Sequence, residues 1–507
     1  MDVQLLVIAA LFLVALFYFR LPSTIYHYYR QLCASRLLPG VPQHWLWGNA
    51  HQIAASFHDW YAISLGLVQS NRWKVTKRWI GPFLMEIEIM HPTAIKKILK
   101  EPKDDSLYRL LRPWLGDGLL LSNGKKWARN RRLLTPGFHY EILKSYIPVY
   151  STCVDVLCSK WEENVRQKEP VKLFNTVSML SLDIVLQCAC SHKSNCQDVR
   201  NTQEYVKAVL TILEMIVDRY LNPLYHMDWY YWKTPTGRTM KKYCDMAHTH
   251  SENVIAERKN VLGLDKNTKN RDDALRNAKR HHKYLDFLDI LLTAEDETGE
   301  GLTDLEIRDE VDTFMFEGHD TTTSGMCWTL YCLAKHPEAQ EKVREEVRSV
   351  LQGRDTLNYD DLKELKYTQW AIKEAMRLYP PVTDFFRVLS DDTEFEGVLV
   401  PKGTRAVVKS YQYHRHPDVW ENPNEYDPLR FTPENSEGRD PYAYIPFSAG
   451  YRNCIGQNFA LNEEKVVVAT IVNRFKLTVD PNQKLTYHPI GIFKVKGDIE
   501  VLVELAI

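Results

Sequence analysis

The chain has 507 residues, 45% of them hydrophobic, so it can bury a large core and is not a disordered protein. Its 64 basic and 65 acidic side chains give a formal net charge of -1, which provides no general attraction to nucleic acid or another highly charged partner. The ten cysteines are scattered along a long chain, which argues against a small secreted disulfide scaffold and favours a reducing compartment.

The N-terminus carries an uncharged apolar run, VQLLVIAALFLVALFYF, from Val3 to Phe19. It approaches the roughly 20 residues that a helix needs to cross a bilayer. Asp2 precedes the run and bulky residues end it, a pattern that does not fit a cleaved signal peptide. We therefore expect residues 1–30 to form an uncleaved anchor. Arg20 and Arg30 follow the run with no base before it, so the positive-inside rule places the rest of the chain in the cytosol.

The remainder reads as a connector and one large domain. The stretch LLPGVPQHWLWGN contains two prolines and two glycines, and we expect residues 31–48 to be a stiff connector. Residues 49–507 show mostly helical spacing of apolar residues, as in PEAQEKVREEVRSVL and YTQWAIKEAMRLY. Short β-like runs such as VLVPKGTRAVVKS and IEVLVELA are few and lie mostly in the C-terminal third. The predicted fold class is mainly α with small β-sheets, α+β.

One long helix is predicted from its end signals. Thr303 and Glu306 form a capping-box pattern at its start. Lys335 and His336 suit its last turn, just before Pro337. At about 1.5 Å per residue such a helix is roughly 45 Å or more long, enough to cross the whole domain.

The middle of this helix is unexpectedly polar, with the sequence FEGHDTTTSG. Glu317 and Gly318 lie four and three residues before Thr321, so all three share one face. The glycine leaves room beside the backbone, and a threonine hydroxyl can bond back to a carbonyl and loosen the helix locally. The stretch is either a packed defect in an apolar helix or the wall of a functional site.

A second motif, FSAGYRNCIG, runs from Phe447 to Gly456 and places Cys454 after Gly450 and Arg452. Glycines let backbone N–H groups approach a sulfur closely, although a turn with a buried cysteine would use the same residues. The full pattern resembles the haem-binding loop of the cytochrome P450 superfamily, F-x-x-G-x-R-x-C-x-G. The resemblance implies haem b (iron protoporphyrin IX) with Cys454 as the axial thiolate ligand of its iron. It also implies that Arg452 pairs with a haem propionate.

The stretch IKEAMRLYPPV provides independent support. Alone, Glu374 and Arg377 would be an ordinary helical ion pair. In the superfamily an E-x-x-R pair is locked by a further arginine, and Arg430 of YDPLRF stands at the matching place. The resemblance gives these three residues a structural role beside the haem.

Further propionate partners follow from the same resemblance. Trp127 and Arg131 have the family's W-x-x-x-R spacing, and Arg387 matches a third partner. Arg131 could instead belong to a basic helix face, which could also dock an acidic redox partner. The other cations of that face are Lys125, Lys126, Arg129 and Arg132.

The resemblance also implies roles for the residues of the polar stretch FEGHDTTTSG. Asp320 and Thr321 match the family's acid–alcohol pair, which delivers protons to bound dioxygen, and Gly318 makes space for a ligand. Glu317 is similar to the glutamate of the microsomal fatty-acid ω-hydroxylase family (family 4 type), which can form an ester with a haem methyl. RRLLTPGFH and PYAYIPFSAGYRNCIGQNFA resemble the same group, and the likeness extends from residue 36 to the end. Thr383 departs from the family's proline-rich pattern at the substrate channel.

The resemblance implies a membrane-bound monooxygenase that hydroxylates fatty acids or related lipids at the terminal (ω) carbon. It would use O2 and electrons from NADPH, delivered by NADPH–cytochrome P450 reductase with cytochrome b5 as a further candidate donor, at the endoplasmic reticulum membrane. Three alternatives remain open: a steroid, terpenoid or xenobiotic substrate, a haem-thiolate isomerase, and a non-enzymatic haem-binding protein. Residues Leu107–Leu121 and Leu213–Leu221 are expected to line the channel that decides the substrate.

Overall fold

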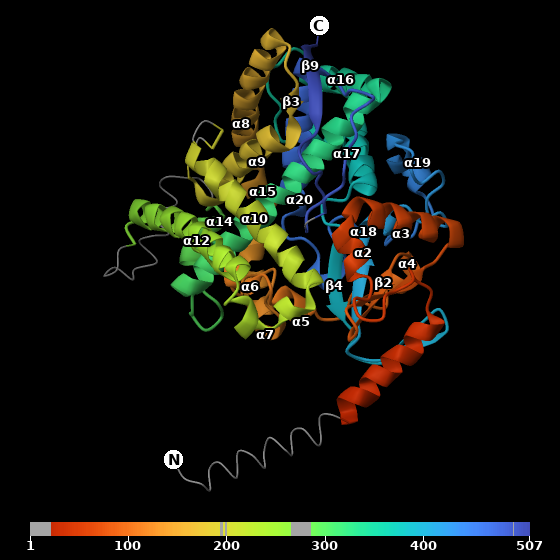
Figure 1. The fold of residues 1–507 in the computed structure, drawn as a ribbon. Coiled ribbons are helices and arrows are strands. Elements are labelled where there is room, and N and C mark those ends of the chain that lie inside the picture. The colour runs from red at the N-terminus through yellow and green to blue at the C-terminus, as the bar shows by residue number, and fades with distance from the viewer. Residues whose placement is uncertain (1–21, 193–195, 198–199, 265–284, 490, 507) are drawn as a thin grey trace.

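The computed structural model describes residues 22–192, 196–197, 200–264, 285–489 and 491–506, without the side chains of residues 200–203. Most of the expected anchor, residues 1–21, lies outside the described residues. Residues 22–37 are helical, so the first part of the expected connector continues a helix (Figure 1). This helix stops before Pro39 and Gly40, because the residue before a proline is disfavoured in the helical conformation.

Helices make up most of the described chain (Figure 1). The α-helices are α2 (Ala50–Ala55), α3 (Phe57–Asn71), α4 (Pro92–Ile95), α5 (Asp105–Tyr108), α6 (Arg112–Leu115), α7 (Gly124–Leu134), α8 (Tyr140–Gln167), α9 (Leu173–Cys190), α10 (Arg200–Leu221), α11 (Asp228–Tyr231), α12 (Pro235–Leu262), α14 (Phe287–Thr293), α15 (Asp304–Lys335), α16 (Pro337–Leu351), α17 (Lys366–Leu378), α18 (Ser410–Tyr413), α19 (Pro433–Ser436) and α20 (Gln457–Arg474). Short 3-10 helices lie at Thr135–Phe138, Pro223–His226, Asp361–Lys363, Pro428–Phe431 and Gly450–Arg452.

The strands form three small sheets. They are β1 (Val75–Ile80), β2 (Leu84–Ile89), β3 (Val171–Lys172), β4 (Asp384–Val388), β5 (Thr393–Phe395), β6 (Val398–Val400), β7 (Arg405–Lys409), β8 (Phe475–Thr478) and β9 (Glu500–Leu505). The largest sheet has the order β1-β2-β7-β4, and the others are β3-β9-β8 and β5-β6. The predicted α+β character is therefore observed, with helices predominating.

The hairpin of β1 and β2 was missed by the sequence reasoning, which expected most strands in the C-terminal third. Both strands carry charges, and the register places Arg78 directly opposite Glu86. Two nitrogens of Arg78 donate to Glu86 Oε2, at 2.9 and 2.6 Å, and both side chains are buried. Cross-strand pairing thus satisfies charges that make the sequence look exposed.

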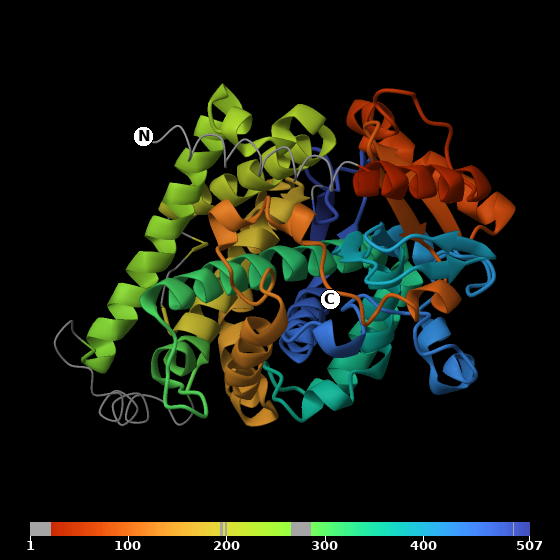
Figure 2. The same ribbon diagram turned by 90° about the horizontal axis from the view of Figure 1, so that it is seen from below.

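The predicted long helix is α15, which runs through the middle of the molecule (Figure 2). Its capping box is formed: Glu306 N–H donates to Thr303 Oγ1 at 3.2 Å, and Thr303 N–H donates to Glu306 Oε2 at 2.9 Å. The helix ends at Lys335, as predicted, and α16 begins at Pro337. It packs against α9, α12, α17 and α20 and so touches most layers of the domain.

Among the described residues, α9 is long and apolar enough to cross a membrane, with a mean hydropathy of 1.5. However, 72% of this helix is buried inside the protein, where it packs on α8 and α15. We therefore assign α9 to the protein core.

Glu374 and Arg377 of α17 form a buried charged triad with Arg430. Two nitrogens of Arg377 donate to the two oxygens of Glu374, each at 2.7 Å, and Arg430 Nε approaches Glu374 Oε1 at 3.2 Å. Arg377 also donates to the carbonyl of Pro423 at 2.7 Å. Glu374 and Arg377 are fully buried, so each provides the charge that compensates the other.

Replacing Glu374 by alanine should leave Arg377 as an uncompensated buried charge. We expect the free energy of unfolding to fall by about 3–5 kcal/mol. Urea denaturation of the full chain, followed by circular dichroism, measures the change. The control Glu437→Ala removes an exposed glutamate and should change stability by no more than about 0.5 kcal/mol. A loss below about 1 kcal/mol in Glu374→Ala would contradict the role of the triad.

Candidate functional site

A cavity of about 430 Å³ lies beside the middle of α15. This is within the usual size range of ligand pockets. Both channel ranges expected from sequence contribute to its walls, the first through Leu107, Leu111 and Leu119 and the second through Leu213 and Ile216. Most of the wall is aliphatic or aromatic, which suits a lipophilic ligand.

One face of α15 opens onto this cavity. Phe314, Glu317, Gly318 and Thr321 are only half-buried, whereas the neighbouring positions of the helix are buried, and all four line the cavity. The Thr321 hydroxyl donates to the Glu317 carbonyl at 2.6 Å. The structure therefore brings the predicted face together, and the polar stretch is the wall of a site.

Gly318 has a packing constraint in addition to its place on the wall. A Cβ atom at this position would lie 3.0 Å from Cγ2 of Val185 on α9, closer than side chains normally approach. The glycine thus allows α15 and α9 to pack closely beside the cavity.

Asp320 does not line the cavity. It is fully buried, and its carboxylate forms an ion pair with Lys494 near the C-terminus. Its Oδ2 has no hydrogen-bond partner among the described residues. Next to it, Thr322 lines the cavity and bonds to Ser181 at 2.6 Å, and Ser181 donates to the buried Glu463 at 2.9 Å. Sequence reasoning missed this second polar chain because its members come from three helices.

Cys454 lies in the loop before α20 and lines the cavity. Among the described cysteines it alone is exposed, and its exposed surface faces the cavity. Burial raises the pKa of its thiol to about 12, whereas the backbone N–H of Gly456 hydrogen-bonds to the sulfur and favours the thiolate. Gly450 shapes the loop through a φ of 76° but does not line the cavity, whereas Phe447 and Gly456 do.

Four cationic side chains line the cavity around Cys454. Three are the predicted Arg131, Arg387 and Arg452, and the fourth is Lys103, which sequence reasoning missed. Arg131 donates to the Asn453 carbonyl at 2.9 Å. Lys103 follows α4 in a polar stretch whose pattern gives no signal for a cavity.

Glu317 is the carboxylate of the cavity wall whose charge acts on Lys103, Arg131 and Arg452. Burial and the charge of Arg452 lower the pKa of Lys103 to about 7. Burial and the charge of Arg387 lower the pKa of Arg452 to about 10. In addition, Arg387 Nε is buried without a hydrogen-bond partner among the described residues. Such an arrangement suits a ligand that carries several anionic groups.

Trp127 and Arg131 lie one turn apart on α7, and both line the cavity as predicted. The Arg452 guanidinium lies 4.3 Å from the centre of the Trp127 ring. The other face of α7 is less basic than its sequence suggests, because three of its cations pair with acids of the same chain. These pairs are Lys126–Asp117 at 3.0 Å, Arg129–Asp296 at 2.6 Å and Arg132–Glu297 at 2.5 Å.

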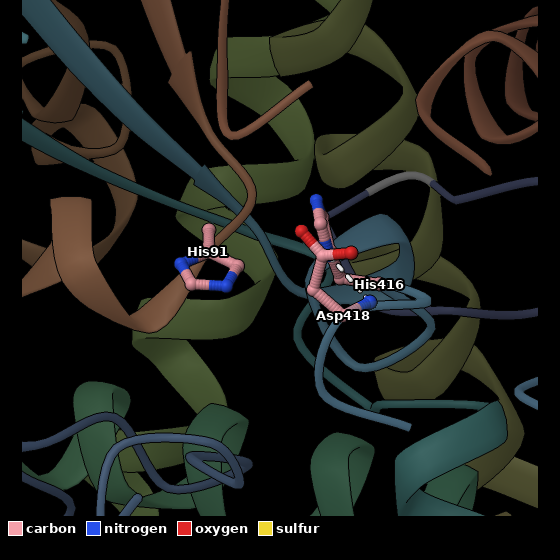
Figure 3. Close-up of side chains that lie close together, drawn as sticks. All are labelled: His91, His416 and Asp418. Carbon is pink, nitrogen blue, oxygen red and sulfur yellow. Dashed lines mark hydrogen bonds between the residues drawn. The ribbon is translucent and has the colours of Figure 1, made fainter. Parts of the chain in front are cut away.

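A cluster outside the cavity, His91, His416 and Asp418, has the composition of a metal site (Figure 3). Nδ1 of His91 accepts the Thr93 N–H, and Nδ1 of His416 accepts the Asp418 N–H, both at 3.2 Å. Each neutral ring must therefore carry its proton on Nε2, which removes the lone pair a metal would need. Asp418 also pairs with Arg72 at 2.6 Å. The histidines consequently cap local backbone.

The site therefore consists of a cysteine open to an apolar cavity, a ring of cations and a helix face with Glu317 and Thr321. These residues fit a haem, because the cysteine can ligate its iron and the cations can neutralise its two propionates. Arg387 Nε, which is buried without a hydrogen-bond partner among the described residues, could donate to a propionate. The fold and the site thus define a haem-thiolate protein.

The comparisons agree: residues 38–502 match the cytochrome P450 family model, and the chain belongs to this family. It is similar to cytochrome P450 4F6 of Rattus norvegicus, with 40% identity over 499 residues, 96% of this chain and 90% of the relative. It is 42% identical to the ultra-long-chain fatty acid omega-hydroxylase of Homo sapiens over 447 residues, 86% and 82% of the two chains. It is 41% identical to leukotriene-B4 omega-hydroxylase 3 of Mus musculus over 438 residues, 84% and 82% of the two chains.

Lys103→Met should weaken haem retention, because it removes one of the cations that could neutralise the propionates while nearly keeping the length of the side chain. We expect haem to transfer to an excess of a haem-free acceptor protein about tenfold faster, as followed by absorbance, from the loss of one charge-assisted bond. Lys100→Met, an exposed lysine three residues earlier, is the matched control. Equal transfer rates in the two variants would show that Lys103 does not contact the cofactor.

Proposed function

We propose that this protein is a membrane-bound monooxygenase that hydroxylates fatty acids or related lipids at their terminal carbon. The observation that carries the proposal is the shape of the site: an apolar cavity leads to a polar face of α15 and to Cys454. A long acyl chain can fill such a cavity and present its methyl end between them. The relatives point the same way, since two of them are named for ω-hydroxylation of an ultra-long-chain fatty acid and of leukotriene B4.

The residues of the site divide the work of the reaction. When bound, haem supplies the iron at which dioxygen is reduced for insertion of one oxygen atom. Cys454 would ligate the iron, and the Gly456 N–H would stabilise the negative charge on its sulfur. Thr321 can hold a water or a proton at its hydroxyl by exchanging its bond to the Glu317 carbonyl. Asp320 passes protons to Thr321 after rotating away from Lys494.

Attack at the terminal carbon needs firm positioning, because a primary C–H bond is stronger than the secondary C–H bond next to it. The walls of the cavity can impose this position on the substrate. We further propose that Glu317 becomes ester-linked to a haem methyl group, which would make the site more rigid. The bond joins a Glu317 carboxylate oxygen to the methyl carbon, with one proton and two electrons lost to the enzyme's own turnover of O2. Glu317 lines the cavity, as the link requires.

We place the protein at the endoplasmic reticulum membrane, with residues 1–30 as a single-pass anchor and the catalytic domain, residues 49–507, in the cytosol. Support comes from large apolar side chains that are exposed on neighbouring segments: Tyr26, Tyr29, Trp45, Phe83 and Trp229. The segments adjoin, since the Tyr28 hydroxyl donates to the Pro82 carbonyl at 3.0 Å and a Cβ on Gly81 would lie 3.1 Å from Pro223. Aromatic residues of this kind favour a membrane interface.

Electrons would come from NADPH through NADPH–cytochrome P450 reductase, with cytochrome b5 as a second donor. The surface above Cys454 includes exposed Lys125 of α7 and half-exposed Tyr451. The pairing of Lys126, Arg129 and Arg132 with acids of the same chain reduces the positive charge of this surface. We therefore expect docking of the reductase to depend only weakly on ionic strength.

The proposed activity is tested with the purified full-length holoprotein, the reductase, NADPH and saturated fatty acids of several chain lengths. We expect NADPH-dependent formation of terminal alcohols, identified by mass spectrometry, and none with Cys454→Ala. Products hydroxylated only within the chain, or no fatty-acid product at all, would contradict the proposal. A rearranged peroxide formed without reductase would identify an isomerase instead.

The ester is tested separately by turnover, acid denaturation and solvent extraction. Haem should remain on the chain in the parent protein and leave it completely in Glu317→Ala. Complete release of unmodified haem from the parent protein after repeated turnover would rule the link out. Absorbance of the protein and solvent fractions at haem wavelengths gives the partition directly.

A further inference from the structure

Asp384, the first residue of β4, places a carboxylate in the wall of the otherwise apolar cavity. Its Oδ2 accepts from Lys409 Nζ at 2.6 Å, and its Oδ1 has no hydrogen-bond partner among the described residues. The Asp384 side chain is 23% exposed, whereas that of Lys409 is 1% exposed. Asp384 is therefore the more accessible member of this pair, although its unpartnered Oδ1 is itself buried in the cavity wall.

The cations on this side of the cavity are already paired. Arg78, which also lines the cavity, forms ion pairs with Glu86 at 2.6 Å and with Glu88 at 3.3 Å. Including the direct partners of these groups, three cations face four carboxylates. The cations are Arg78, Arg405 and Lys409, and the carboxylates are Glu86, Glu88, Asp104 and Asp384. This contrasts with the surplus of cations around Cys454.

A free carboxylate head group would therefore meet a net negative wall here. To bind Lys409 it would have to displace Asp384, and to bind Arg78 it would have to displace a buried glutamate; either change leaves an acid without its cation and is unfavourable. An uncharged hydroxyl or amide N–H can instead donate to Asp384 and leave both ion pairs intact. Hydrogen bonds to a charged acceptor are among the stronger ones in proteins.

We propose that Asp384 selects lipids that carry an uncharged hydrogen-bond donor, a hydroxyl or an amide N–H, over free fatty acids of the same chain length. The inference rests on the proposed function, since it names the substrate class of that same cavity. Nearby Tyr61 also lines the cavity, and burial together with the charge of Asp384 raises its pKa, so it stays a neutral phenol. The departure of Thr383 from the family pattern falls at the residue before Asp384.

Binding to the holoprotein, followed by the change in haem absorbance, tests this inference. The probes are a saturated primary alcohol, a primary amide and a carboxylic acid at three matched chain lengths, at a pH where the acid is ionised. We expect the alcohol or amide to bind the parent protein about tenfold more tightly than the acid. In Asp384→Asn, which keeps the shape but frees Lys409, the acid should gain about tenfold in affinity.

The double variant D384N/K409M should lose this gain, because no unpaired cation remains to receive the acid. Asp391→Asn, at an exposed aspartate, is the matched control and should keep the parent ratio of dissociation constants. An acid-to-alcohol ratio that is the same in Asp384→Asn and Asp391→Asn overturns the inference. A ratio that changes as expected while no chain is hydroxylated at its terminal carbon would instead leave the recognition standing and reject the proposed activity.

Discussion

The positive charge enclosed around Cys454 is the constraint on which the rest of the site depends. Lys103, Arg131, Arg387 and Arg452 come from four separate segments, and burial makes their mutual repulsion costly. Glu317 is the carboxylate of the cavity wall whose charge acts on Lys103, Arg131 and Arg452. The cluster therefore favours an anionic ligand, and the haem of this family carries two propionates that these cations could neutralise.

The long helix α15 links this charge cluster to the substrate. Its ends are fixed by a capping box and by the proline that begins α16, so the middle can carry polar residues without ending the helix. One face presents Glu317 and Thr321 to the cavity, whereas Asp320 is held by Lys494 on the other side. Asp320 and Thr321 are adjacent in sequence, yet the first is buried and the second faces the cavity.

Features determined by local sequence were predictable. The helix start at Thr303, the stop before Pro337 and the Glu374–Arg377 pair all depend on residues within one or two turns. Motif spacing also placed Trp127, Arg131 and Arg387 at the cavity. A motif match is enough to predict the position of a residue when the elements that carry the motif are arranged in the same way throughout the family.

Features that depend on distant partners were not predictable. Asp320 meets a lysine 174 residues away, and the charges of β1 and β2 look exposed until the register places Arg78 opposite Glu86. Lys103 belongs to no motif, and Asp384 would be an ordinary surface aspartate without the strand that brings Lys409 beside it. In each case a partner distant in sequence allows a charged side chain to lie in the interior of the protein.

The close approach of Gly318 to Val185 has a consequence for how such enzymes diversify. Because a methyl group on residue 318 would press against the valine of α9, the two positions share one small volume. A relative with alanine at the glycine position needs a smaller side chain at the valine position or a wider gap between the helices. The two sites should therefore change together in evolution, and a substitution at residue 185, which itself lines the cavity, can alter the cavity both directly and through the spacing of the two helices.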